Sequence, residues 1–151
     1  MKHYLEISLH NHKIFESFLE NYQTQRLFLI PEGFGNNLMW NIGHALAVQQ
    51  LLTYGRAGLP PVLPQAFLDA YKPGTQPPKE EDPRLIEELK SQLYLGVQQL
   101  EKDIHAGKFD AFEPYTTRIG YEIDSIEKAL HFNNYHEGLH IGYLLCLKKF
   151  V

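Results

Sequence analysis

The amino-acid sequence predicts an all-α protein, a four-helix bundle with a long Pro-rich crossover between its second and third helices. In four segments of the 151-residue chain, apolar residues recur at the three- and four-residue spacing of amphipathic helices. Seven of the nine prolines lie between Leu59 and Pro83, in a stretch that separates the second segment from the third. No run of alternating apolar and polar residues predicts a strand.

The first two helices are predicted from apolar spacing and from residues that favour helix ends. The first helix should end before Pro31-Glu32-Gly33. The second should begin at Asn36-Asn37, because asparagine is a favoured N-cap, and should run to about Gly55, where glycine suits the C-terminal cap. The apolar residues of the first helix are Leu5, Leu9, Phe15, Phe18, Leu19 and Tyr22.

The third helix should follow a long irregular connection. Pro73-Gly74 and Pro77-Pro78 are turn or breaker signals within that connection. The pair Asp82-Pro83 predicts an N-cap followed by a proline at the first helical position, and the helix should stop by Gly107. Its apolar residues are Leu85, Leu89, Leu93, Val97, Leu100 and Ile104.

The fourth helix should begin near Asp124-Ser125 and continue almost to the end of the chain. The crossover is long enough to return to the other end of the molecule, so the second and third helices can be parallel. Two helical hairpins that pair only in a dimer would show the same periodicities, and this alternative stays open. The apolar residues of the fourth helix are Ile126, Ala129, Leu130, Tyr143, Leu144 and Leu147.

Length, composition and charge limit the classes of protein that the chain can belong to. A chain of 151 residues fits one domain, and we expect residues 1–151 to form it. The net charge of −4 disfavours a nucleic-acid partner, because binding phosphates needs a clustered basic surface. No run of roughly 20 apolar residues could cross a membrane. A single cysteine, Cys146, and the lack of an uninterrupted apolar stretch near the start predict a cytoplasmic protein.

Three histidines form the candidate site. His136 and His140 are four residues apart, so at roughly 100° per residue they lie on one face of a helix and can reach one ion. A catalytic divalent ion usually takes three protein ligands and keeps one position open. His44 is the best third ligand, because the apolar residues on its face of the second helix would turn it inward. Those residues are Trp40, Ala47, Val48 and Leu51.

The same histidines are compatible with two other interpretations, a hydrogen-bonded core and a metalloprotease site. A lone inward histidine is more often a hydrogen-bonded core residue than a ligand, and the His136/His140 pair is what favours a metal. The H-E-x-x-H pattern also occurs in zincin metalloproteases, where Glu137 would be the general base, but the chain lacks the strand that aligns a peptide in such enzymes. We expect the five remaining histidines to be solvated: His3, His10, His12, His105 and His131.

Three motifs stand out in the chain: Asn37-Leu38-Met39-Trp40-Asn41-Ile42-Gly43-His44, Tyr71-Lys72-Pro73-Gly74 and His136-Glu137-Gly138-Leu139-His140-Ile141-Gly142. Together they resemble the DinB-like superfamily. The resemblance implies a four-helix bundle whose metal is held by one histidine of the second helix and two of the fourth, here His44, His136 and His140. Tyr143 departs from the glutamine that often follows the glycine of the last motif.

The resemblance also suggests a range of activities, since members of that superfamily include thiol S-transferases, isomerases and metal-dependent hydrolases. We expect a metal-dependent transferase or hydrolase that acts on a small molecule, with a low-molecular-weight thiol as one candidate. A divalent ion can acidify a water molecule or hold a thiol as thiolate. Zn or Ni is the expected metal, with Fe or Cu as alternatives. Glu137 could serve as a base or orient a group at the metal, or it could pair at the helix surface.

A noncatalytic, metal-stabilised dimeric stress or binding protein is the alternative function. The fourth helix carries a second apolar strip besides its histidine face, and helices that are apolar on two sides need two partners. We therefore expect a homodimer, unless both strips are internal to one bundle. A large open pocket over the metal would favour an enzyme. The strip residues are Phe132, Tyr135, Leu139 and Cys146 in the fourth helix and Leu38, Ile42, Ala45 and Leu46 in the second.

Overall fold

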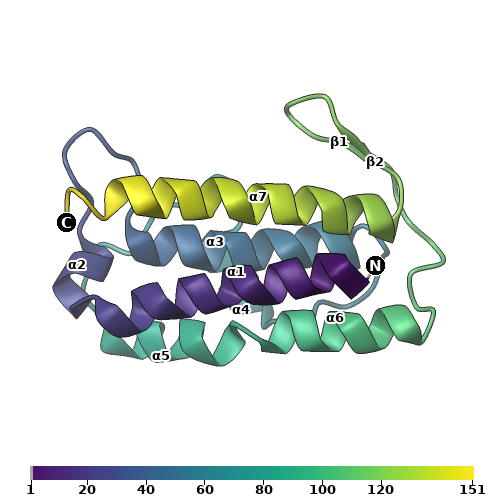
Figure 1. Cartoon of the computed structure of the whole chain (residues 1–151), viewed down its shortest axis with the longest axis horizontal. Helices are drawn as coiled ribbons and strands as arrows, with labels where there is room; N and C mark the ends of the chain where they lie inside the picture. The colour runs from purple at the N-terminus through teal and green to yellow at the C-terminus, as the bar shows by residue number, and fades with distance from the viewer. Residues whose placement is uncertain (1) are drawn as a thin grey trace.

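The computed structural model describes residues 2–151, and most of them lie in helices (Figure 1). This confirms the all-α class. A two-residue strand pair is the small exception. The elements are α1 (Lys2–Asn21), α2 (Thr24–Phe28), α3 (Leu38–Gln50), the π-helix η1 (Leu51–Gly55), α4 (Gln65–Tyr71), α5 (Pro83–Gln92), α6 (Leu95–His105), β1 (Tyr115–Thr116), β2 (Glu122–Ile123) and α7 (Ile126–Leu147).

The predicted helix starts are confirmed by their caps. The Asn37 side chain accepts a hydrogen bond of 2.8 Å from a backbone N–H in the first turn of α3. Asp82 does the same at 3.0 Å for α5, where Pro83 takes the first helical position. Ser125 caps α7 with a weaker bond of 3.4 Å. These side chains satisfy backbone donors that have no partner within their own helix, and so fix where each helix begins.

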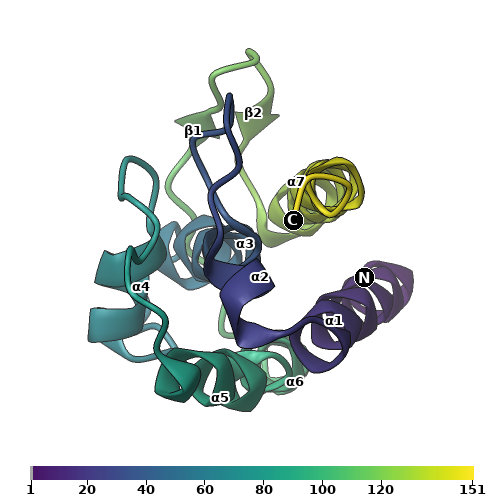
Figure 2. The same cartoon turned by 90° about the vertical axis from the view of Figure 1, so that its left-hand side faces the viewer.

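The long helices lie side by side around α3 (Figures 1 and 2). α1 and α7 run in one direction, whereas α3 and the α5–α6 pair run in the other, so residues 56–82 cross from one end of the molecule to the other. Every residue of α3 is buried, as expected of a helix with partners on all sides. The second apolar strip predicted on this helix is therefore internal and cannot be a dimer face. Its members Leu38, Ile42, Ala45 and Leu46 are at most 1% exposed.

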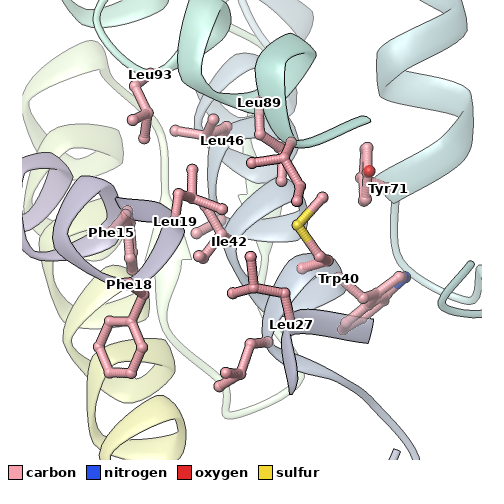
Figure 3. Close-up of a cluster of buried hydrophobic side chains, with 14 of the residues drawn as sticks. Phe15, Phe18, Leu19, Leu27, Trp40, Ile42, Leu46, Tyr71, Leu89 and Leu93 are labelled. Carbon is pink, nitrogen blue, oxygen red and sulfur yellow. The ribbon is translucent and has the colours of Figure 1, made fainter. Parts of the chain in front are cut away.

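The hydrophobic core sets the rotation of α3 about its axis. Ile42 and Leu46 point into a cluster that Phe15 and Leu19 of α1 and Leu89 of α5 complete (Figure 3). Burying each such side chain contributes ~1.5–3 kcal/mol. Because two residues turn a helix by roughly 200°, this packing directs the residue midway between Ile42 and Leu46 to the opposite flank, toward α4 and α7. That residue is the predicted ligand of the second helix.

Short elements were missing from the sequence prediction. The crossover, expected to be irregular, contains α4, whose apolar residues Phe67, Leu68 and Tyr71 are buried but too few to show a period. The first predicted helix ends at Asn21, and a separate short α2 follows. The third is broken between α5 and α6.

The β1–β2 hairpin stands off the helices beside the start of α7 (Figure 1). Its strands are antiparallel, with Tyr115 opposite Ile123, and Gly120 in the turn has a φ of +83° that favours glycine. Two residues per strand are too few for an alternating pattern to predict. Across residues 2–151, the helices are too short or too polar to span a membrane.

Candidate metal centre

α3 and α7 bring the three predicted histidines together. One ring nitrogen from each of His44, His136 and His140 lies within 4.8 Å of the others. The Nε2 atoms of His136 and His140 are 3.2 Å apart. Two nitrogens at ~2.05 Å from a tetrahedral ion would be roughly 3.3 Å apart, so this spacing fits a shared metal.

Hydrogen bonds to the far ring nitrogens fix which atoms face the centre. His44 Nδ1–H donates to the backbone oxygen of Tyr71 at 2.8 Å, and His140 Nδ1–H donates to Asn41 Oδ1 at 2.9 Å. Asn41 Nδ2 donates to the backbone oxygen of Asn37 at 2.7 Å, which turns the side-chain oxygen of Asn41 toward His140. A histidine that donates through Nδ1 keeps the lone pair on Nε2 for a metal. Two of the three candidate ligands thus have Nε2 free to face a metal ion.

Trp40 holds the plane of the His44 ring. The two rings are stacked, with centroids 4.5 Å apart and planes 15° apart. The indole Nε1–H donates to Thr75 Oγ1 at 3.0 Å, so a residue of the Pro-rich crossover anchors Trp40 in turn. The stack and the bond to Tyr71 together leave the imidazole little freedom to rotate.

The environment keeps the three imidazoles neutral. Burial lowers the pKa of His44. Burial, with His44 nearby, lowers the pKa of His136 to about 4. Burial, together with its two histidine neighbours, lowers that of His140 to about 3. His136 Nδ1 is buried and has no hydrogen-bond partner in the described chain. Neutral nitrogens gathered around one point suit a divalent cation, so the residues present fit a metal ion.

A cavity of about 410 Å³ opens beside this cluster and is bordered by His44 and His136. Helix α3, η1 and α7 form its mostly apolar walls, and the β1–β2 hairpin covers another side. The wide turn of η1 ends α3, and π-helical turns of this kind are frequent at functional sites. His44 and His136 therefore border a space that is large enough for a small molecule.

Comparison with known protein families matches residues 10–144 to the DinB superfamily. The chain belongs to the DinB superfamily. The match includes all three histidines and confirms the family predicted from the motifs. No curated protein and no solved structure matches the chain.

In this DinB-superfamily protein, the carboxylate of Glu137 lies neither at the open side of the metal centre nor at the helix surface. Glu137 is fully buried and faces α1 instead of the open side of the metal centre. It accepts hydrogen bonds from Ser8 Oγ at 3.0 Å and Asn11 Nδ2 at 2.8 Å. His12 Nε2 at 3.1 Å and Asn133 Nδ2 at 2.8 Å complete the set. The catalytic role of Glu137 stays a prediction, and these contacts favour a positioning role between α1 and α7.

The prediction that His12 is solvated was wrong, because its side chain is fully buried. A signal was available in the sequence: Ser8 and His12 continue the stripe of Leu5 and Phe15 along α1 at three- and four-residue spacing. His131 is half-buried against the ring of Tyr4, with centroids 3.9 Å apart. His3, His10 and His105 are exposed, as predicted.

Proposed function

We propose that the chain is a metal-dependent enzyme that binds one divalent ion through His44, His136 and His140 and acts on a small molecule. The observation that supports this is the cavity of about 410 Å³ against His44 and His136. Structural metal sites are closed by protein ligands, whereas catalytic sites keep a position open to substrate. A thiol S-transferase or a small-molecule hydrolase fits such a site.

The residues of the chain would hold and shape the reaction site. A divalent ion supplies a Lewis acid that acidifies a water molecule or a thiol. The Tyr71 oxygen and Asn41 Oδ1 orient two of the ligand rings. Val48 and Phe132 belong to the mostly apolar lining that limits water near the centre. Excluding water strengthens every electrostatic interaction inside the cavity.

Glu137 supports the site as a positioning residue in this proposal. Its carboxylate holds α7 against α1 through three donors of α1, which are Ser8, Asn11 and His12. Asn133 of α7 donates to the same carboxylate. Service as a general base would require the carboxylate to leave these partners. The earlier expectation of a base can still be tested with the Glu137→Gln variant.

The ligand set limits the metal without naming it. Neutral imidazoles suit Zn, Ni, Fe or Cu, and we propose Zn or Ni as the first candidates. Elemental analysis of the purified protein would identify the bound ion. One ion per chain is expected.

Metal content and turnover test the proposal together. Replacing His44, His136 or His140 by Ala should remove most of the bound metal, whereas His10→Ala, at an exposed site on α1, should not. Thiol-transfer and hydrolysis screens on metal-loaded protein should find a turnover that chelation abolishes and added metal restores. Full metal content in any of the three variants would remove that residue from the site. Metal binding without turnover across both screens would count against an enzyme.

A noncatalytic homodimer stabilised by metal is the second candidate. The side chains of Tyr135 and Leu139 on α7 are 50% and 53% exposed, and Cys146 is exposed as well. A dimer could cover this strip, and light scattering would then report about twice the chain mass. A monomer at micromolar concentration would contradict it. We also propose a cytoplasmic location, because a chain with one cysteine cannot form an internal disulfide.

A further inference from the structure

The cavity beside the histidines also contains positive charge. Two arginines line it, Arg56 directly after η1 and Arg118 in the β1–β2 hairpin. We propose that the cavity binds an anionic apolar molecule, whose hydrocarbon part packs on the apolar wall and whose carboxylate or phosphate group pairs with these guanidinium groups. The proposal rests on the proposed function, because it names the substrate class of the same site.

The apolar wall fits the hydrocarbon part of such a ligand. The cavity is lined by Leu51 and Leu52 of η1 and by Phe132 and Leu139 of α7. A volume of about 410 Å³ is in the range of small-molecule sites, which are mostly apolar with a few polar groups that fix orientation. A small polar substrate alone would leave this wall in water.

The charges of the cavity select an anion. Arg56 and Arg118 line it, and among residues 2–151 no carboxylate does, although the whole chain carries a net charge of −4. Charge of one sign gathered in a cleft with apolar walls raises the local concentration of ions of the opposite sign. Guanidinium groups bind carboxylate and phosphate through paired N–H donors. An acidic protein with a positive cavity therefore points to an anionic ligand.

The two arginines have different degrees of order. The Arg56 guanidinium lies 4.4 Å from the centroid of the Tyr115 ring, which orders it through a cation–π contact. Arg56 also forms an ion pair with the exposed Glu113, whose Oε2 is 3.7 Å from an Arg56 nitrogen, a distance too long for a hydrogen bond. Donors of Arg56 thus stay available.

Arg118 is exposed and forms no ion pair within residues 2–151. Its backbone is nevertheless fixed, because the preceding Thr117 is buried and exchanges hydrogen bonds of 2.9 and 3.0 Å with Tyr121 across the hairpin. Arg118 can therefore close on an anion from a fixed position, without movement of the helices.

Calorimetry with three eight-carbon probes tests the proposal: octanoate, octyl phosphate and 1-octanol. Wild-type protein should bind at least one of the anions about 10-fold more tightly than 1-octanol, and the stronger anion identifies the headgroup. Arg118→Gln and Arg56→Gln should each lower the affinity for that anion about 10-fold, as expected for the loss of a charged hydrogen bond. The affinity for 1-octanol should change by less than about 2-fold. Arg84→Gln is the matched control, since Arg84 is exposed on α5 and paired with Asp82.

The same titrations in metal-loaded and chelated protein separate this proposal from the metal-dependent activity. Arginine-dependent anion binding in both forms supports the proposal even if no turnover is found. Equal anion affinity in wild type and the two arginine variants would overturn it, as would anion binding that needs the metal but neither arginine. If a variant does not fold, the salt dependence of wild-type binding decides, because only anion binding should weaken as NaCl increases.

Discussion

Replacing Gly43 by alanine should damage both stability and metal binding. A Cβ built on Gly43 would lie 2.6 Å from Cε1 and Cγ of Tyr71, closer than such atoms can approach. The Tyr71 ring is buried and packs on Phe67, with centroids 4.8 Å apart, so it has little room to yield. The backbone oxygen of the same Tyr71 accepts the Nδ1–H of His44. A shift of α4 would therefore reach the metal centre.

The size of the effect follows from two opposing terms. Overpacking in a well-packed core costs about 1–3 kcal/mol, and alanine in a helix interior is better than glycine by about 1 kcal/mol. The net loss for Gly43→Ala should be about 0–2 kcal/mol. Gly138→Ala is the matched control, because no atom of residues 2–151 lies within 4 Å of the Cβ it would add and Gly138 is exposed in α7. It should gain about 0.5–1 kcal/mol.

Urea denaturation of chelated protein would measure the difference in free energy of unfolding between the two variants. In thermal denaturation, a difference of about 1 kcal/mol corresponds to about 2–4 °C in Tm for a chain of this size. Competition with a metal-binding dye would measure affinity, which should fall about 10- to 100-fold in Gly43→Ala alone, the usual effect of losing a partner of a ligand. Equal stability and equal metal affinity in the two glycine variants would show that the contact between Gly43 and Tyr71 does not support the metal centre.

Three further predictions follow from the same contacts. Asn41→Leu should lower metal affinity about 10- to 100-fold, measured by dye competition, because His140 Nδ1–H loses its acceptor. Glu137→Gln should lower the free energy of unfolding by about 1–3 kcal/mol in urea, because both carboxylate oxygens accept hydrogen bonds and an amide N–H would face a donor. Chelated protein should lose stability as the pH falls from the ordinary histidine pKa of 6.5 toward about 4, because the folded-state pKa of His136 is about 4 and that of His140 about 3. The unfolded chain binds more protons in that window, so the stability is complete above pH 6.5 and falls by at most about 1.4 kcal/mol per pH unit for each histidine.

Each of these predictions has its own control or contrary outcome. Asn21→Leu, at an exposed site in α1, should leave metal affinity unchanged, and an unchanged affinity in Asn41→Leu would show that the amide does not orient His140. Glu20→Gln, also exposed, should leave stability unchanged. A Glu137→Gln variant with full stability and metal but no turnover would restore the role of general base. Stability that is flat between pH 4 and 6.5 in chelated protein would contradict the lowered pKa values.

The sequence predicts those parts of the fold that depend on residues close together in the chain. Asn37, Asp82 and Ser125 mark helix starts because a cap needs only the residues that follow it. His136 and His140 could be paired because four residues return a helix to the same face. Such features depend on a few neighbouring residues, and the structure bears out their placement.

The parts that escaped prediction depend on contacts between distant segments. Glu137 lies about 100° from His136 around the helix, and its direction has a chemical meaning only once α1 is known to pack on that face. His12 is buried by that same packing. Helix α4 is stabilised by burying Phe67 and Tyr71 against its neighbours, and seven residues alone would not hold a helix in water.

The three candidate ligands come from helices that are far apart in the chain, so metal binding at this site would be coupled to completion of the fold. Asn41, beside His44, bonds His140 across a separation of 99 residues, so α7 must be in place before the three nitrogens meet. An ion that binds only the native state stabilises it by mass action, about 2.7 kcal/mol when its free concentration is 100 times the Kd. Chains that stop before α7 gain nothing from the metal. Metal supply would therefore set how much of the newly made protein persists in the folded state, before any substrate is present.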